Sequence, residues 1–339
     1  MGVLNRRLAA PLALVSVVSL ALTWGASPGV AAAPALPHYD HVFLIVEENH
    51  GFSQVIGNPA APNLNAMAKR YGLATRYFGV SSPSLPNYLA MVGGNTFNVG
   101  DDNAYWFNLQ HKPSLMSQLE GAKLSWKGYF QSMPYAGFRG DCYPVRCVGM
   151  PDQDPLYAVK HNAMPYFASI SGSATERAKL TPLPQLAADL AGNRIPNFGY
   201  IIPDECHDMH GSPPDCVDSG NPGDPQENRL IGDGDTLLGS IVSQLTGASF
   251  WSKGNNAIVV TFDEGMDGDT SGCCDANPGS GRVATVVITS KGPRGVSDNT
   301  KYNHYSLLQT LQRVFGLGCL EFTCDTKHVT PMTALFGVA

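Results

Sequence analysis

The stretch from His41 to Asn49 reads His-Val-Phe-Leu-Ile-Val-Glu-Glu-Asn, so a short apolar run leads directly into two carboxylates and an amide. An uninterrupted run of this kind is typical of a strand that is buried on both faces of a parallel sheet. Three later runs have the same character and lie at residues 198–202, 257–262 and 283–289. The four runs therefore predict a sheet that is covered on both of its faces.

Segments with helical periodicity separate or follow these runs, at residues 64–71, 115–119, 183–190, 237–245 and 306–315. Strands that alternate with helices indicate an α/β layered fold whose sheet is mostly parallel. No linker rich in Ser, Gly or Pro and no internal repeat divides the chain, so a single large domain is expected.

The composition is that of an ordered globular protein, since 43% of the 339 residues are apolar and 15% are charged. The 36 glycines and 25 prolines predict that much of the chain forms turns and irregular loops around the core. A coiled coil and a helical-repeat protein are excluded by this composition.

The N-terminal residues have the order of a secretory signal. Arg6 and Arg7 precede an apolar segment at residues 8–22, and small residues follow it. The apolar segment has about 15 residues, whereas a membrane-spanning helix needs roughly 20, so a stable membrane span is not expected. We therefore expect residues 1–33 to be a signal peptide and residues 34–339 to be a secreted or cell-envelope domain. Sec and twin-arginine export both remain open.

Charge and cysteine usage agree with export. Without the signal peptide the chain carries 20 basic and 28 acidic side chains, so binding to nucleic acid is not expected. Eight cysteines in an exported chain favour disulfide bonds. Short separations suggest the pairs Cys142/Cys147, Cys206/Cys216 and Cys319/Cys324, which leaves the adjacent Cys273 and Cys274.

Acidic side chains follow three of the predicted strands, at the point where each strand ends. They lie in residues 47–49, 203–210 and 263–265, and the second group also contains histidines. Because the carboxyl ends of parallel strands meet at one edge of a sheet, these carboxylates would repel each other unless a cation neutralised them. The candidate metal ligands are Glu48, Asn49, Asp263, Glu264, Asp208, His210 and His304. Each of them, taken alone, could instead be an exposed loop residue or a helix cap.

The candidate nucleophile is Ser84, because two prolines fix the backbone around it in residues 81–89, Ser-Ser-Pro-Ser-Leu-Pro-Asn-Tyr-Leu. By itself this pattern indicates the start of a helix. A metal ion that faced Ser84 would lower the pKa of its hydroxyl, and amides at a helix start can receive an anion. Asn87, one turn later, would offer its side-chain amide to a phosphoryl oxygen.

Six segments together resemble a known family. They are residues 45–49 (Ile-Val-Glu-Glu-Asn), 84–88 (Ser-Leu-Pro-Asn-Tyr), 160–162 (Lys-His-Asn), 208–210 (Asp-Met-His), 261–265 (Thr-Phe-Asp-Glu-Gly) and 304–308 (His-Tyr-Ser-Leu-Leu). In this order they are similar to the phosphoesterase family of secreted acid phosphatases and phospholipases C, within the alkaline phosphatase superfamily. The resemblance implies a three-layer α/β sandwich with a mostly parallel central sheet.

The resemblance also implies roles for the site residues. It implies that Ser84 is the nucleophile, that Asn87 holds the phosphoryl group, and that Glu48, Asn49, Ser84 and Asp263 share one metal ion, with Glu264 ligating or supporting it. Asp208, His210 and His304 correspond to a second metal site in two-metal relatives, or else they bind phosphate or protonate the leaving group. Lys160 and His161 become candidates for contacting the substrate phosphate.

Two positions depart from the family pattern. Asp204 stands in a stretch where relatives often carry Asn, and Glu264 stands where two-metal enzymes carry His after the aspartate. The second change favours a harder divalent ion than zinc at that site, such as calcium, manganese or magnesium. Zinc, iron and the number of ions, one or two, are not distinguished by the sequence.

The function expected from the resemblance is hydrolysis of phosphoric esters. Because no added lipid-binding domain is evident, we expect an acid phosphatase-like phosphomonoesterase acting on a small phosphorylated substrate. A phospholipase C that binds a phospholipid headgroup is the alternative, and a secreted metal-containing binding protein without turnover is an alternative of another class. Residues 94–150, which are rich in aromatic side chains, are expected to cap the pocket. The oligomeric state is left open.

Overall fold

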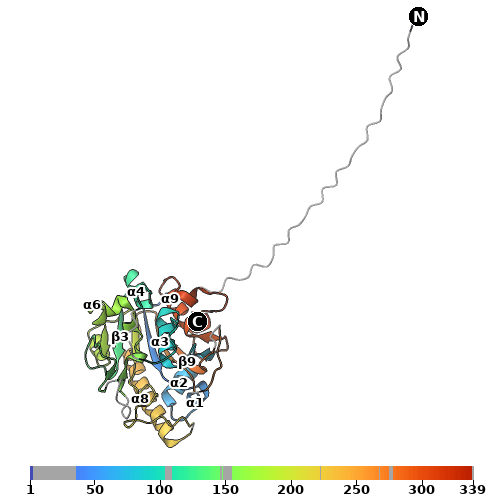
Figure 1. The fold of residues 1–339 in the computed structure, drawn as a ribbon. Coiled ribbons are helices and arrows are strands. Elements are labelled where there is room, and N and C mark those ends of the chain that lie inside the picture. Colours follow the sequence, from blue (N-terminus) through green and yellow to red (C-terminus); the bar gives the residue numbers. More distant parts are fainter. Residues whose placement is uncertain are drawn as a thin grey trace. The chain divides into compact units, whose positions relative to one another are not determined.

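The computed structural model describes residues 1–2, 36–103, 109–145, 147, 155–221, 223–266, 268–274 and 278–337 (Figure 1). The chain divides into two compact units, Met1–Ala33 and Pro34–Ala339. Nearly all of the first unit, which is the expected signal peptide, lies outside the described residues. Everything below concerns the second unit.

The second unit is built around one large sheet and a two-stranded hairpin. The strands are β1 His41–Glu47, β2 Gly72–Phe78, β3 Trp126–Phe130, β4 Cys142–Tyr143, β5 Tyr157–Ala158, β6 Leu180–Pro182, β7 Phe198–Ile202, β8 Asn256–Phe262, β9 Arg282–Thr289, β10 Val296–Asp298 and β11 Tyr302–Asn303. The large sheet has the order β10-β2-β9-β8-β1-β7-β3-β6, and β11 pairs with β2. The hairpin joins β4 to β5.

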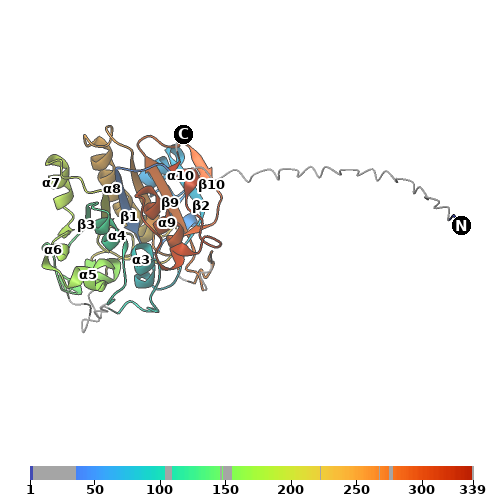
Figure 2. The same ribbon diagram turned by 90° about the horizontal axis from the view of Figure 1, so that it is seen from above.

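Helices cover the large sheet. They are α1 Phe52–Val55, α2 Pro62–Arg70, α3 Ser84–Gly93, α4 Leu115–Gly121, α5 Ala168–Ser171, α6 Ala174–Arg177, α7 Gln185–Ala191, α8 Pro225–Gly247, α9 His304–Val314 and α10 Thr333–Phe336. Short 3₁₀ turns form η1 Val159–His161, η2 Met164–Tyr166 and η3 Glu321–Cys324. Helix α2 packs with α8, and α3 packs with α9. Figure 2 shows α8 and α3 on opposite sides of β1, so the expected layered α/β fold is confirmed.

The four apolar runs form β1, β7, β8 and β9, and the sheet is mostly parallel as expected. Every residue of β7 and β8 is buried, which explains why these strands have no polar alternation. Strand β9 is the exception to the parallel arrangement, because it runs antiparallel to both β2 and β8.

The region expected to cap the pocket, residues 94–150, lies only partly within the described residues. Its middle part is not a cap, because β3 pairs with β7 in the central sheet and α4 packs on β3. Trp126, Tyr129 and Phe130 are buried in the core. Aromatic side chains in that stretch therefore serve packing, since a strand inside the sheet buries both of its faces.

All eight cysteines are paired in the structure. The bonds are Cys142–Cys147, Cys206–Cys216, Cys319–Cys324 and Cys273–Cys274. The three local pairs agree with those suggested by sequence separation, and the two remaining cysteines are joined to each other. Among the described helices, none has the length and apolar character needed to cross a membrane.

Candidate functional site

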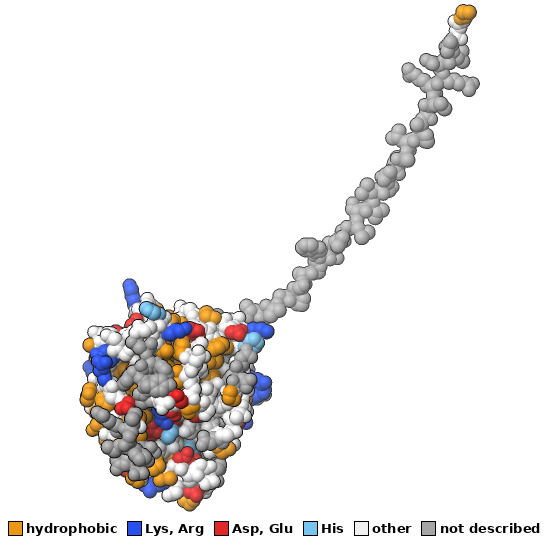
Figure 3. Space-filling model, viewed as in Figure 1, with side chains coloured by type: hydrophobic (Ala, Val, Ile, Leu, Met, Phe, Trp, Pro, Cys, Tyr) orange, Lys and Arg blue, Asp and Glu red, His pale blue; other side chains and the backbone are white. Residues whose placement is uncertain are grey.

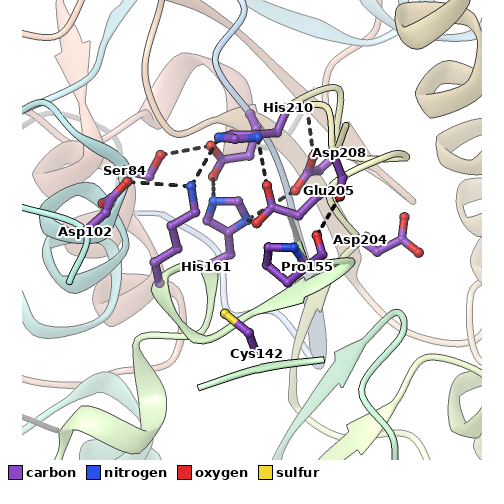
Figure 4. Close-up of polar contacts among 12 residues, drawn as sticks. Ser84, Asp102, Cys142, Pro155, His161, Asp204, Glu205, Asp208 and His210 are labelled. Atoms are coloured by element: carbon purple, nitrogen blue, oxygen red, sulfur yellow. Dashed lines mark hydrogen bonds and ion pairs between the residues drawn. The ribbon is translucent and has the colours of Figure 1, made fainter. Parts of the chain in front are cut away.

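The site lies at the carboxyl edge of the sheet, where three neighbouring strands end. Strand β1 lies between β8 and β7 and is parallel to both, so the segments after all three strands meet. The backbone N–H of Asp263, after β8, donates to the carbonyl of Glu47 at 3.0 Å, and Glu48 N donates to the carbonyl of Asp208 at 2.7 Å. The predicted convergence of acidic strand ends is therefore present, and Figure 4 shows Glu205 and Asp208, which follow β7, beside Ser84 and His161.

Glu48 lies at the centre of the site and is fully buried. Its Oε2 accepts a hydrogen bond from Ser84 Oγ at 2.9 Å, and its Oε1 accepts one from the Tyr88 hydroxyl at 2.5 Å. Ser84 is the first residue of α3, and Tyr88 lies one turn further on the same helix face. Ser84 Oγ also lies 3.4 Å from Glu264 Oε1. The start of α3 thus presents a serine hydroxyl to two carboxylates.

Asn49 and Asp263 complete what we call the oxygen group: Glu48, Asn49, Ser84, Asp263 and Glu264. The backbone N–H of Asn49 donates to Asp263 Oδ1 at 3.2 Å. Asn49 Oδ1 and Asp263 Oδ2 are buried and accept no hydrogen bond. Buried oxygens without a donor are costly, and a divalent cation would satisfy them, so the residues fit the expected metal ion.

The electrostatics of the oxygen group favour the binding of a cation. Burial, and then the charges of Asp263 and Asp208, raise the pKa of Glu48 well above its usual value. Burial raises the pKa of Asp263 to about 6. Carboxylates held together away from water favour their protonated forms unless a cation lies among them.

A second cluster adjoins the oxygen group and contains nitrogen donors. We call it the imidazole group: Lys160, His161, Glu205, Asp208 and His210. His161 Nδ1 lies 3.2 Å from Asp208 Oδ2 and 3.5 Å from Glu205 Oε1, and His210 Nδ1 lies 2.7 Å from Glu205 Oε2. His161 Nε2 lies 3.2 Å from Glu48 Oε1, which links the two groups.

Most charges within the imidazole group compensate one another, but burial and the Glu205 charge raise the pKa of Asp208 well above its usual value. Burial would raise the pKa of Glu205, but the charges of His210, Lys160 and His161 outweigh it and hold that pKa far below its usual range. Burial would lower the pKa of Lys160, but neighbouring carboxylates, Glu205 first, raise it. Burial lowers the pKa of His161 well below its usual value. For His210, the Glu205 carboxylate outweighs burial and raises the pKa.

Lys160 lies at the entrance of the site. Its Nζ donates to His210 Nε2 at 3.1 Å and lies 3.6 Å from Asp102 Oδ2. The side chains of Lys160, His210 and Asp102 are 17%, 25% and 29% exposed, whereas His161 is 3% exposed. Figure 3 shows acidic, basic and histidine side chains gathered in one place on this face of the molecule. Solvent therefore reaches the site over these three residues.

The side-chain amide of Asn87, expected to hold a phosphoryl group, instead forms hydrogen bonds with the backbone of the turn before α3. Its Oδ1 accepts from the backbone N–H groups of Val80 and Ser81, at 2.9 Å and 3.1 Å. Its Nδ2 donates to the carbonyls of Ser81 and Pro83, at 2.6 Å and 3.3 Å. Both ends of the fully buried amide therefore hold the backbone that carries Ser84.

His304, the first residue of α9, lies on the other side of Asp263. Its Nε2 donates to the carbonyl oxygen of Asp263 at 2.5 Å, and its Nδ1 accepts from the Tyr77 hydroxyl at 3.1 Å. Burial lowers the pKa of His304 to about 4. Because both ring nitrogens are used in this way, neither faces Asp208 or His210, and the structure does not unite the three as one set of ligands.

Tyr88 and Glu205 contribute to the site but are absent from the sequence-based candidates. Tyr88 lies within the segment that contains Ser84, and its spacing of four residues from Ser84 on one helix could have identified it. Glu205 lies in the acidic stretch after β7, but a buried carboxylate and a solvated one look the same in a sequence.

Asp204, the departure from the family pattern, points away from the cluster in Figure 4. It accepts a hydrogen bond from Ser132 Oγ at 2.6 Å, and its Oδ1 lies 2.6 Å from His207 Nδ1. Adjacent residues in one turn, Asp204 and Glu205, thus belong to different hydrogen-bonded networks.

Known proteins resemble this chain in sequence and in fold. Residues 58–318 match the model of the Phosphoesterase family. A phosphatidylinositol-3-phosphatase of Mycobacterium tuberculosis is 30% identical over 324 residues, which cover 94% of this chain and 92% of that protein. A phosphate-repressible acid phosphatase of Penicillium chrysogenum is 30% identical over 86% of this chain, and the match spans 65% of the fungal protein. A Vibrio parahaemolyticus protein in the alkaline phosphatase superfamily superposes with a TM-score of 0.52 at 12% identity, covering 84% of this chain and 68% of that one.

Proposed function

Because the chain belongs to the phosphoesterase family, whose model spans residues 58–318, we propose that it cleaves phosphate monoesters through a phosphoseryl intermediate on Ser84, with a divalent metal ion. Hydrolysis of phosphoric esters is the reaction of the relatives named above. The observation that carries the proposal is the hydrogen bond from the Ser84 hydroxyl to Glu48, inside a buried group of carboxylates. A serine at a helix start beside such a group is arranged for nucleophilic attack.

The oxygen group would hold the metal ion through Glu48, Asn49, Ser84 and Asp263, with Glu264 supporting it. The unpartnered oxygens of Asn49 and Asp263 support this assignment. When bound, such an ion supplies Lewis acidity and lowers the pKa of a coordinated hydroxyl. A set of oxygen ligands favours magnesium, calcium or manganese.

In the proposed reaction Ser84 Oγ gives its proton to Glu48 Oε2, its hydrogen-bond acceptor, and attacks phosphorus in line, while the bond from phosphorus to the alcohol oxygen breaks. The amide of Asn87 keeps the turn before α3 rigid, so its proposed role is to position the serine. The Lys160 ammonium, whose pKa is raised, stays protonated at neutral pH and faces the oxygens of the phosphate. His161, and His210 beside it, contact the phosphate or pass a proton to the leaving oxygen. Water then attacks phosphorus and releases phosphate from Ser84.

The two relatives support the proposed substrate class, since the names of both describe removal of a phosphate group. We therefore favour a phosphomonoesterase over a phospholipase C, which cleaves a diester. The proposed role of His304 is to hold Asp263 in place through a hydrogen bond to the backbone carbonyl of Asp263. We also propose that the protein is exported through its N-terminal signal.

The test compares Ser84→Ala with Ser82→Ala, in which an exposed serine two residues earlier is removed. The assays use p-nitrophenyl phosphate, bis-p-nitrophenyl phosphate and phosphatidylcholine, with and without a chelator. We expect Ser84→Ala to lower turnover of the monoester by about 10³-fold or more, with Ser82→Ala close to wild type. Near-normal turnover in Ser84→Ala would reject the mechanism, and faster cleavage of phosphatidylcholine than of the monoester would reject the substrate class.

A further inference from the structure

Three side chains from three different elements converge at the border of the oxygen and imidazole groups. Glu48 follows β1, His161 ends η1 and His210 follows β7. Each can offer one ligand atom such that the three atoms lie within 4.8 Å of one another. His161 is nearly fully buried, and its Nε2 makes no hydrogen bond although it lies 3.2 Å from Glu48 Oε1. One carboxylate and two imidazoles are a donor set that suits zinc.

Lys160 occupies the approach to this set. Its Nζ lies 3.1 Å from His210 Nε2, so a single hydrogen lies between the two nitrogens. The Nε2 lone pair is then not available to a metal ion, whichever nitrogen carries that hydrogen. The ammonium also brings a positive charge among the carboxylates of Glu205, Asp102 and Glu48. A divalent ion beside it would be repelled, so the ion and the lysine exclude each other.

We propose that Glu48, His161 and His210 form a latent second cation site, which the Lys160 ammonium keeps closed. The native protein then holds one divalent ion, at the oxygen group, and Lys160 supplies the second positive charge of the centre. This inference rests on the proposed function for the first ion, with which the latent site shares Glu48, whereas His161 and His210 belong to the latent site alone.

The difference between the two positions is chemical. At the oxygen group, Asn49 Oδ1 and Asp263 Oδ2 lack any donor, so an ion is needed there. Beside the latent site, Glu205 Oε1 and Asp208 Oδ2 also accept no hydrogen bond, but there the charge of Lys160 already lies among the carboxylates. Removal of the lysine charge should therefore leave the carboxylates beside the latent site without a compensating positive charge. The latent site should then bind a divalent ion, as we propose for the oxygen group.

The experiment measures zinc binding to Lys160→Met, which keeps the length of the side chain but removes its charge. Protein stripped with a chelator is titrated with Zn²⁺ by calorimetry at pH 8, and bound metal per chain is counted after gel filtration. Wild type should bind one equivalent and Lys160→Met two, the second at least about 100-fold more tightly than any second ion on wild type. Lys160→Arg keeps the charge and should bind one.

A double variant, Lys160→Met with His210→Gln, should bind one equivalent again, because it lacks one of the three ligands. Circular dichroism checks the fold of each variant, and Lys160→Gln replaces Lys160→Met if that variant does not fold. Two equivalents on wild type, or no more bound zinc on the two neutral variants than on wild type, would overturn the proposal. If wild type binds no ion, the metal-dependent function is rejected. In that case the latent site would still be supported if Lys160→Met bound one ion and the double variant with His210→Gln bound none.

Discussion

The oxygen group and the imidazole group lie side by side at the same edge of the sheet, yet only the imidazole group contains cationic side chains. In the oxygen group, the pKa values of Glu48 and Asp263 are raised, and two buried oxygens accept no hydrogen bond. In the imidazole group, Glu205 is held ionised by Lys160 and the histidines around it, although burial and the Glu205 charge raise the pKa of Asp208 and its Oδ2 also accepts no hydrogen bond. The comparison supports the proposal that the oxygen group binds a cation from solution, whereas Lys160 already supplies a positive charge to the imidazole group.

The largest effect is expected from Asp263→Asn, which removes one negative charge from the oxygen group. Because the amide still fits the same space, the fold should persist while metal affinity is lost. We expect monoester turnover to fall by about 10³-fold, measured at saturating metal. If Asp263→Asn kept both its turnover and one bound ion, the proposal that the oxygen group holds the metal ion would be contradicted.

The second prediction concerns pH and applies to the protein stripped of metal. The pKa of Asp263 is raised to about 6 in the folded protein, so its contribution to stability is present at low pH and is lost as pH rises. We expect chelated protein to lose unfolding free energy between about pH 4 and pH 7, measured by urea denaturation, with on the order of 3 kcal/mol of the loss coming from Asp263. Metal-loaded protein should not show this loss, because the bound ion stabilises the ionised carboxylate. Identical curves for the two forms would contradict the account.

The third prediction concerns Glu205→Gln, which removes the charge that orients His210. Its Oε2 lies 2.7 Å from His210 Nδ1, so the variant changes the hydrogen bonding of that imidazole. We expect turnover to fall by about 10- to 100-fold, as for other carboxylates that orient histidines in metal sites. Bound metal should stay at one equivalent, since Glu205 is not a member of the oxygen group. Loss of the bound ion in Glu205→Gln would contradict this account, because it would show that the imidazole group is also needed to hold the ion.

The smallest effect is expected from Asp204→Asn, the matched control one residue earlier. Asp204 bonds to Ser132 and His207 and points away from the site. Stability should fall by about 1 kcal/mol through the weakened hydrogen bonds, with turnover within about 2-fold of wild type. If Asp204→Asn lowered turnover as much as Glu205→Gln, Asp204 would also be needed for activity, and the assignment of the two residues to separate networks would be wrong.

The sequence was a good guide to the parts of the fold that are buried on both faces. Strands β1, β7, β8 and β9 stand out because their apolar runs are continuous. Strands β2 and β3 were not predicted, since Arg76 interrupts one and Lys127 the other. The first half of α8 was missed as well, because its glycines and acidic residues hide the helical period.

Part of the candidate site could be predicted as well, because some of its residues directly follow the predicted strands. Residues that directly follow strands, such as Glu48 and Asp263, are found by the rule that parallel strand ends share an edge. Asp102 follows no strand and lies in a polar loop, so only the folded chain brings it to Lys160. The use of the Asn87 amide within its own turn also could not be read from the sequence, because it depends on where the backbone of residues 80–83 lies.

The central claim is that the Ser84 hydroxyl lies at a cation centre formed by the ends of β1 and β8. An anomalous difference map from crystals soaked in Mn²⁺ tests it most directly. The account predicts one strong peak within about 2.5 Å of Ser84 Oγ and of oxygens from Glu48, Asn49 and Asp263. A fully bound ion elsewhere, with none at the oxygen group, would contradict it.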